Sequence, residues 1–290
     1  MGRPRRLEQQ AGRHALVDGI PFHLPVRSEQ TPALMAAFSV NPDKAQALLP
    51  GIEVHPFRVW NKGLLIVTVV NYVITNIGKY IEFSIAIACT RGSRPAPRLL
   101  PALFIKTFGT GQYVYDLPVS TEISVKGGKG IWGMPKHQAS LDFVVGEQWV
   151  SSQYDLDGQL VMRIDVARPR SAWLPVSMGG TNYCAFRGML MASYIYFKGK
   201  LGFFLMKDGS ARLSIGDHPR IRALKDLEIS ERPLFAGYFP ETQGVLDDHF
   251  DCWFLSEERP PKTPMEGMES VMNLGQSQEW LAPPKRRPDM

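Results

Sequence analysis

The sequence contains no long hydrophobic run. Its longest apolar stretch, Leu64 to Val70, is far shorter than the roughly 20 residues that a helix needs to cross a bilayer. No apolar segment follows the basic residues at the start of the chain, so we expect no secretory signal peptide and no membrane partner. With 44% apolar and 21% charged residues, the composition is that of a folded soluble protein and argues against global disorder.

Cysteine is scarce in this chain. The three cysteines, Cys89, Cys184 and Cys252, lie far apart, and their odd number does not fit a disulfide framework. Free thiols persist in reducing compartments. We therefore expect a cytoplasmic protein.

The common catalytic and metal-binding motifs are also missing. No G-x-S-x-G, H-E-x-x-H or C-x-x-C sequence occurs. Gly128, Gly130 and Gly133 do spell G-x-G-x-x-G, but a dinucleotide site needs a helix that starts within the motif, and Pro135 and the alternation after it argue against one. The acidic segment 247–251 has metal-ligand residue types without the spacing of a metal site. We interpret it as a polar loop and expect no metal.

Much of the net charge of +5 lies at the two ends of the chain. The basic residues there are Arg3, Arg5, Arg6, Lys285, Arg286 and Arg287. Short basic ends can contact nucleic acid, but they are more often solvated, and no nucleic-acid motif accompanies them. We expect residues 1–15 to form a mobile basic tail and predict no nucleic-acid partner.

Alternating polar and apolar residues dominate the middle of the chain and predict short strands. We expect strands within residues 22–40, 64–74, 80–86, 113–124, 149–154, 160–166 and 173–178. Asn41 and Asp217 are suited to cap short helices, because each is followed within two residues by a proline. The stretch from Tyr183 to Phe204 has no clear pattern. This organisation predicts a mainly β (α+β) fold, an antiparallel sheet closed or nearly closed into a barrel with a few short helices.

The most informative segment surrounds Lys136. Glycines lie before it, and the bulky apolar residues Trp132 and Met134 are candidates to contact a substrate. From Ala139 to Phe143 the residues alternate as in a half-buried strand, so the glycine-rich stretch is interpreted as a connection into a strand. An ammonium group among apolar side chains is poorly solvated, which favours the neutral amine, a nucleophile for carbonyl carbons. The alternative is that Lys136 is a solvated surface residue, as most lysines are.

Residues Gly128 to Lys136, reading GKGIWGMPK, resemble the segment of the acetoacetate decarboxylase family that ends in its Schiff-base lysine. The Tyr80-Ile81-Glu82 segment and the Asp217-His218-Pro219 segment resemble two further parts of that family in the same order. The resemblance covers about residues 30 to 240. It implies a barrel of the acetoacetate decarboxylase type, Lys136 as the catalytic lysine, no cofactor, and a homo-oligomer.

The resemblance also suggests other site residues. Glu82 lies on the polar face of an expected strand, which faces either solvent or a cavity; in the family this glutamate lines the site. The family uses an arginine of its first strand to bind the substrate carboxylate. When the family's position for this arginine is counted back from Pro50, it falls near Thr31 and not on an arginine. Arg27 is the nearest arginine and therefore the candidate to bind the carboxylate. Four further arginines remain open as carboxylate partners: Arg91, Arg168, Arg170 and Arg187.

We therefore expect one acetoacetate decarboxylase-like domain at residues 16–245 and a proline-rich extension at 246–290. The expected function is a Schiff-base carboxy-lyase that decarboxylates a β-keto acid, with Lys136 as nucleophile and Glu82 as general acid or base. Two other functions stay open. One is a Schiff-base aldolase or dehydratase, and the other is a barrel that binds an apolar ligand without catalysis. A third possibility is that the protein is a catalytically inactive member of the family that serves in assembly.

Overall fold

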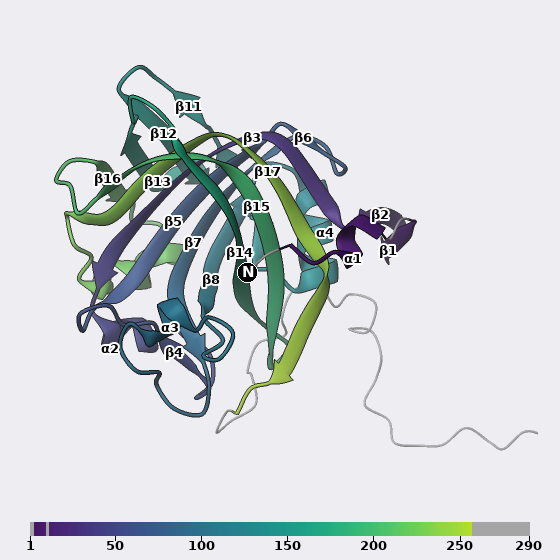
Figure 1. Cartoon of the computed structure of the whole chain (residues 1–290), viewed down its shortest axis with the longest axis horizontal. Helices are drawn as coiled ribbons and strands as arrows, with labels where there is room; N and C mark the ends of the chain where they lie inside the picture. Colours follow the sequence, from purple (N-terminus) through teal and green to yellow (C-terminus); the bar gives the residue numbers. More distant parts are fainter. Residues whose placement is uncertain (1–2, 10–11, 257–290) are drawn as a thin grey trace, which may run out of the picture.

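A closed β-barrel forms the centre of the computed structural model, which describes residues 3–9 and 12–256 (Figure 1). Seven strands of this described chain make the barrel. In order around it they are β7 (Tyr80–Arg91), β5 (Gly63–Tyr72), β3 (Val26–Val40), β17 (Pro233–Phe254), β15 (Met189–Leu205), β14 (Leu174–Phe186) and β8 (Gly111–Val119). Pairing of β8 with β7 closes the circle. The expected barrel is therefore confirmed.

The barrel is mixed, and not purely antiparallel as we expected. β14 and β8 pair in parallel, and the short strand β9 (Lys136–Gln138) also pairs in parallel with β8, further along the same edge that binds β14. Small strands extend the sheet at its margins: β4 (Val54–Pro56) pairs with β7, and β6 (Ile74–Thr75) pairs with β3. The unassigned stretch after Tyr183 forms a long hairpin of β14 and β15. Its turn places both Arg187 and Gly188 at positive φ.

A second sheet packs against the outside of the barrel, at the upper left of Figure 1. It contains β10 (Ser140–Leu141), β11 (Val144–Val145), β12 (Trp149–Leu156), β13 (Gln159–Ala167) and β16 (Ala211–Ile215). Its buried residues Tyr154, Met162 and Ile164 share one core with Phe38 and Phe83 of the barrel. The barrel wall thus has an apolar outer face here and leaves its inner face for a cavity.

The glycine-rich stretch before Lys136 is a helix, α4 (Glu122–Trp132), and not the connection that we expected. Three of its glycines lie against other side chains: a Cβ atom on Gly127 would lie 2.8 Å from the Phe22 ring, one on Gly128 would lie 2.4 Å from Lys136 Cδ, and one on Gly130 would lie 2.5 Å from Val17 Cγ1. Close packing therefore outweighs the low helix propensity of glycine. Gly133 ends the helix with φ 64°.

The expected mobile tail is instead attached to the barrel. α1 (Arg6–Gln9) is followed by a hairpin of β1 (Arg13–Val17) and β2 (Ile20–Leu24), and this N-terminal segment covers the end of the barrel near α4 (Figure 1). Arg6 binds Asp247 and Asp248 at 2.6 and 2.8 Å. Arg13 also binds Asp248. These ion pairs, together with the burial of Leu7, explain why the segment is docked.

Two further expectations need correction at the C-terminal side. The boundary that we expected at residue 245 falls inside β17, which continues to Phe254 beside β15. Residues 247–251 are therefore part of a strand and not a loop. The proline-rich part of the extension, together with Lys285, Arg286 and Arg287, lies outside the described residues.

The remaining helices are short. Asn41 caps α2 (Pro42–Gln46), as predicted, by accepting hydrogen bonds from the backbone of Asp43 and Lys44. α3 (Leu100–Leu103) lies at the same end of the barrel, at the lower left of Figure 1. The segment at 219–227 is a 3₁₀ helix, η1 (Pro219–Leu227), and His218 caps it in place of Asp217. Its buried residues recur every third position, which suits three residues per turn.

Candidate active site

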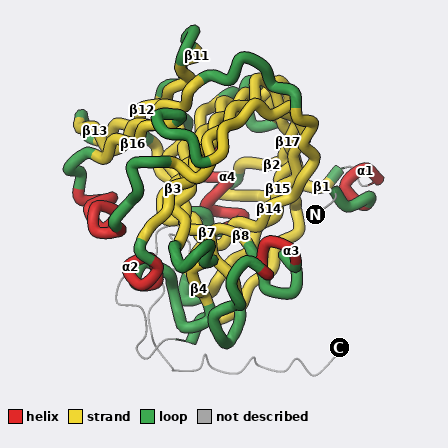
Figure 2. The backbone as a smooth tube through the Cα atoms, turned by 60° about the vertical axis from the view of Figure 1, so that its left-hand side comes forward, coloured by secondary structure: helices red, strands yellow, loops and turns green. Residues whose placement is uncertain are grey.

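Lys136 is buried at the inner face of the barrel. It begins β9 and lies beside Leu117 of β8, and only 4% of its surface is exposed. α4 crosses the end of the barrel next to it, as the turned view in Figure 2 shows. Because Gly128 has no side chain, the helix can lie directly on the methylene groups of the lysine. The amine is therefore positioned by α4, by the Gly133 cap that ends this helix, and by β9, which begins at the lysine.

Three polar or aromatic groups surround the lysine nitrogen. Lys136 Nζ lies 2.7 Å from Glu82 Oε2 and donates a hydrogen bond to Ser124 Oγ at 3.0 Å. It also lies 5.3 Å from the centre of the Tyr80 ring. Ser124, which is fully buried, comes from α4, whereas Glu82 and Tyr80 come from β7. A buried lysine paired with a single carboxylate is the central feature of the site.

The polar face of β7 points into the barrel. Tyr80, Glu82 and Ser84 line a cavity there, while the intervening Phe83 and Ile85 belong to the outer core. The alternation in the sequence left solvent and cavity open, and the structure places this face in the cavity. On the neighbouring strand β5, Tyr72 lies opposite Tyr80.

Burial changes the acidity of groups near the lysine. Desolvation and the charge of Glu82 raise the pKa of Tyr72 and Tyr80 well above the ordinary value of 10.0. Desolvation also raises the pKa of the Cys184 thiol to about 12, although the charge of Lys136 opposes this. All three groups therefore stay protonated near neutral pH. The two phenols can act only as hydrogen-bond donors or acceptors and not as bases.

The cavity has a volume of about 160 Å³. Apart from Lys136 and Glu82, its polar lining consists of Ser28, Thr31, Thr68, Tyr72, Tyr80, Ser84, Gln112, Asn182 and Thr242. Gln112 donates a hydrogen bond to Asn182 at 2.8 Å, so these two amides satisfy each other in part. Aliphatic and aromatic side chains of the barrel strands make up most of the rest.

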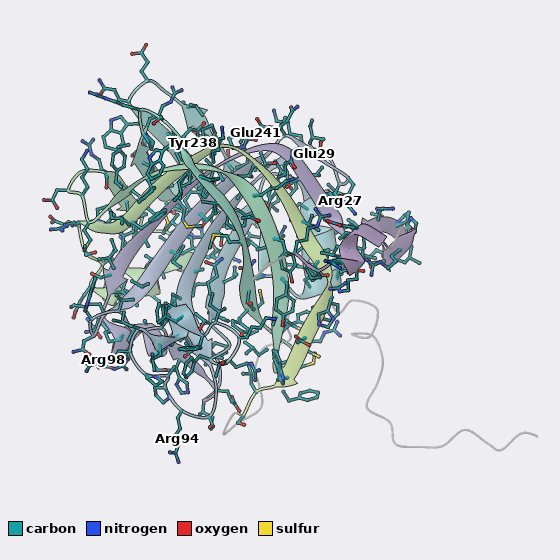
Figure 3. The ribbon with its side chains drawn as sticks, in the orientation of Figure 1. Arg27, Glu29, Arg94, Arg98, Tyr238 and Glu241 are labelled. Carbon is teal, nitrogen blue, oxygen red and sulfur yellow. The ribbon has the colours of Figure 1, made fainter. Side chains whose placement is uncertain are left out.

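Of the three residues that we predicted to contact the substrate, only one lies in the cavity. Met134 lines the cavity. Trp132 does not; it is buried behind the site and donates its indole hydrogen to the carbonyl of Asp247 at 3.1 Å. Arg27 also lies outside the cavity, where its guanidinium donates to the Leu7 carbonyl at 2.8 Å. Figure 3 shows Arg27 at the edge of the barrel beside the N-terminal segment. Thr31, which counting back from Pro50 reached, does line the cavity.

The four other arginines that remained open also lie elsewhere. Arg91 stacks on Trp253, and Arg187 stacks on Phe186. Arg168 donates to the Gly146 carbonyl, and Arg170 is exposed. Arg94 and Arg98 project from the opposite end of the barrel, near α3 (Figure 3). Among the described residues, no arginine lines the cavity.

His137 faces away from the cavity, as expected for the neighbour of Lys136 in a strand. Its Nε2 lies 3.0 Å from Asp116 Oδ1. Asp116 is 1% exposed and also accepts hydrogen bonds from Tyr154 and Arg220, at 3.1 and 2.7 Å. This cluster ties β9 to the second sheet and η1 on the side opposite to the lysine.

Within residues 3–9 and 12–256, no group of three or more histidine, cysteine, aspartate or glutamate side chains is arranged to hold a metal ion. No helix in the same part of the chain is both long and apolar enough to cross a membrane.

The fold and the site together define the protein as a closed β-barrel with a lysine and a carboxylate paired inside it. Residues 10–180 match the family model of acetoacetate decarboxylase, which is more than half of the chain. The chain belongs to the acetoacetate decarboxylase family. No curated protein matches it.

Solved structures show the same fold at low sequence identity. Acetoacetate decarboxylase from Legionella pneumophila is 15% identical, with a TM-score of 0.54, over 79% of this chain and 89% of that one. The enduracididine biosynthesis enzyme MppR, in complex with the condensation product of pyruvate and imidazole 4-carboxaldehyde, is 15% identical, with a TM-score of 0.54, over 79% and 89% of the chains. An acetoacetate decarboxylase-like enzyme from Sphingomonas wittichii RW1 is 15% identical, with a TM-score of 0.51, over 80% and 94%. These likenesses concern the fold.

Sequence reasoning missed several residues of the site. Tyr80 and Ser84 share the alternating face of Glu82, so the same pattern could have identified them. Ser124 and Tyr72 carry no such signal. Ser124 lies in α4, which we interpreted as a connection because of its glycines. Tyr72 reaches the site only because β5 pairs with β7.

Proposed function

We propose that the protein is an imine-forming lyase in which Lys136 is the nucleophile and Glu82 transfers protons. The single observation that carries this proposal is the buried Lys136–Glu82 pair, 2.7 Å apart inside a cavity of substrate size. An amine next to a carboxylate can lose its proton locally and attack a carbonyl carbon. The family membership supports the same chemistry.

The first step forms a carbon–nitrogen bond. Lys136 passes a proton to Glu82, and its lone pair attacks the carbonyl carbon. The carbonyl oxygen leaves as water, whose two protons both come from the lysine nitrogen through Glu82. The product is an iminium ion with one proton left on nitrogen. It accepts an electron pair when a neighbouring bond breaks.

Decarboxylation of a β-keto acid is the first candidate reaction, because the family is named for it. The bond to the carboxylate breaks, its electrons move to the iminium nitrogen, and CO₂ leaves. A proton from water, delivered through Glu82, then adds to the enamine carbon. Hydrolysis releases the ketone and restores the lysine. The scheme needs no metal or organic cofactor.

Aldol-type chemistry is the second candidate, and the lining of the cavity favours it. In a β-hydroxy carbonyl substrate, Glu82 takes the hydroxyl proton, the carbon–carbon bond breaks toward the iminium, and an aldehyde leaves. The enamine carbon then takes the proton back. This reaction needs no carboxylate on the substrate, and none of the described arginines lines the cavity. The reverse reaction, followed by loss of water, is a condensation.

The proposal is tested by trapping the imine. The full chain is incubated with acetoacetate, pyruvate or simple aldehydes in the presence of borohydride, and the reduced adduct is mapped by peptide mass spectrometry. We expect an adduct on Lys136 that is absent from Lys136→Ala and retained in Lys126→Ala, a surface lysine of the same segment. Product analysis then separates CO₂ release from aldehyde release. A folded protein that gives no adduct with any carbonyl compound would instead support a barrel that only binds a ligand.

A further inference from the structure

The charge content of the cavity limits what the site can bind. Lys136 and Glu82 are the only charged side chains among the described residues that line it, and they are paired at 2.7 Å. Their charges cancel. The other polar groups of the lining are hydroxyls, phenols and two amides that bind each other. The cavity is therefore nearly neutral overall and largely apolar.

Cations near the cavity are directed away from it. Arg27, Arg3 and Lys198 line, with Glu29, a neighbouring cleft at the surface that adjoins the cavity at Ser28 and Phe197. The Arg27 guanidinium is held there by the Leu7 carbonyl, and the Arg27 backbone amide donates to Asn76. The position inside the cavity that sequence counting suggested for a guanidinium holds Thr31, a residue 1% exposed whose hydroxyl donates to the Glu29 carbonyl.

This arrangement has a consequence for a bound carboxylate. Once Lys136 has formed an imine, its remaining positive charge lies beside Glu82, so it is already balanced. A carboxylate elsewhere on the substrate would be buried without a partner, and such a charge is strongly disfavoured. A carbonyl compound whose remaining atoms are uncharged meets no such cost. Its chain would lie against Val26, Leu34, Val70 and Phe197.

We propose that the substrate is an uncharged, largely apolar aldehyde or ketone. This inference rests on the imine chemistry proposed above and selects aldol-type cleavage or condensation over decarboxylation. The volume of about 160 Å³ sets the size. An apolar cavity of about 150 Å³ in another protein accommodates benzene. The site therefore suits a carbonyl compound of about that bulk, with hydroxyl groups of the lining available to one further oxygen.

The test compares two methyl ketones of equal non-hydrogen atom count, methyl pentyl ketone and levulinate. Neither loses CO₂, so both report imine formation alone. Each is titrated against the full chain with cyanoborohydride at neutral pH, and modification of Lys136 is measured by mass spectrometry. Methyl pentyl ketone should reach half-maximal modification at a concentration at least about tenfold lower than levulinate.

Three variants sharpen the comparison. Thr31→Arg places a guanidinium inside the cavity and should reverse the preference, whereas the matched neutral variant Thr31→Gln should not. Arg27→Gln should leave the labelling of both ketones unchanged, because that side chain lies outside. The wild-type comparison decides the question even if Thr31→Arg does not fold.

The outcomes separate this inference from the proposed function. Stronger labelling by levulinate, or a loss of levulinate labelling in Arg27→Gln, would overturn the uncharged substrate and leave imine formation intact. If neither ketone labels Lys136, both proposals fail together. Stronger labelling by methyl pentyl ketone, reversed in Thr31→Arg, is the result that we expect.

Discussion

At the scale of single residues, the Lys136–Glu82 pair places a proton between an amine and a carboxylate whose atoms are 2.7 Å apart. Glu82→Gln keeps the shape of the side chain but cannot accept that proton. We expect the exchange of ketone α-hydrogens for deuterium, which reports enamine formation, to slow by about a hundredfold or more. The measurement is proton NMR of methyl pentyl ketone incubated with the protein in D₂O.

The same change on the surface provides the control. Glu122 is exposed in the first turn of α4, and Glu122→Gln should leave the exchange rate unchanged. If Glu82→Gln exchanges hydrogen as fast as the wild type, Glu82 serves only to hold the lysine, and another group must move the proton.

At the scale of elements, α4 positions the amine through one glycine. An alanine Cβ at position 128 would lie 2.4 Å from Lys136 Cδ and 2.8 Å from Cε, so the lysine side chain must move. A displacement of about 1 Å at a reacting group can cost a hundredfold in rate. We expect Gly128→Ala to reduce borohydride trapping by about that factor, with little change in thermal stability, because the flexible lysine yields and alanine favours the helix.

Gly130 lies in the same helix but faces the N-terminal segment. Gly130→Ala would press on Val17 and not on Lys136, so it should keep the trapping rate while loosening β1. Equal losses of trapping in the two variants would show that α4 is disturbed as a whole and would contradict the specific role of Gly128.

The N-terminal segment is a second element whose attachment can be measured. Burial alone would raise the pKa of Asp248, but the hydrogen bond from Arg6 and the charges of Arg13 and Arg6 lower it below its ordinary 3.8. A carboxylate with a lowered folded-state pKa stabilises the folded state above its unfolded pKa, and that stabilisation is lost as the pH falls through the folded value. The segment should therefore stay docked at neutral pH and detach only at pH values below about 4.

Hydrogen exchange tests this attachment. We expect the joint change Arg6→Gln and Arg13→Gln to speed amide exchange in residues 13–24 at neutral pH, while the barrel strands keep their protection. High salt should have a weaker effect in the same direction, because the two arginines are about one-third exposed. Unchanged protection in the double variant would mean that apolar contacts of the hairpin hold the segment.

The same elements show what the sequence could and could not predict. The alternation of β7 was sufficient to place Glu82 and Phe83 on opposite faces, because the period of a strand is local. The helix at α4 was not predictable, because two of its three packed glycines lie against residues that are distant in the chain, Phe22 and Val17. The docked tail depends on Asp247 and Asp248, some 240 residues away in the chain, and no local pattern reports such an ion pair.

At the scale of the whole molecule, one buried carboxylate joins the barrel to the second sheet. Asp116 of β8 accepts hydrogen bonds from Tyr154 of β12 and from Arg220 of η1, and it binds His137 of β9. Desolvation and the charge of Asp116 raise the pKa of Tyr154 far above its ordinary value, so the phenol remains a donor. The apolar core is also shared between the two sheets. They should therefore unfold as one unit.

Asp116→Asn tests whether this carboxylate joins the barrel and the second sheet into one unfolding unit. The amide keeps the volume but removes the charge and turns one acceptor into a donor, so at least one of the three partners loses its hydrogen bond. We expect a loss of about 2 to 3 kcal/mol in the free energy of unfolding, because hydrogen bonds to buried charges are worth about that much. Tyr154→Phe removes a single hydroxyl and should cost about 1 kcal/mol. Urea unfolding is followed by circular dichroism and by the fluorescence of the six tryptophans, which include Trp132 of α4 and Trp149 of the second sheet. Coincident transitions are expected. Separate transitions, or a cost for Asp116→Asn no larger than for Tyr154→Phe, would show that the two sheets are stabilised independently.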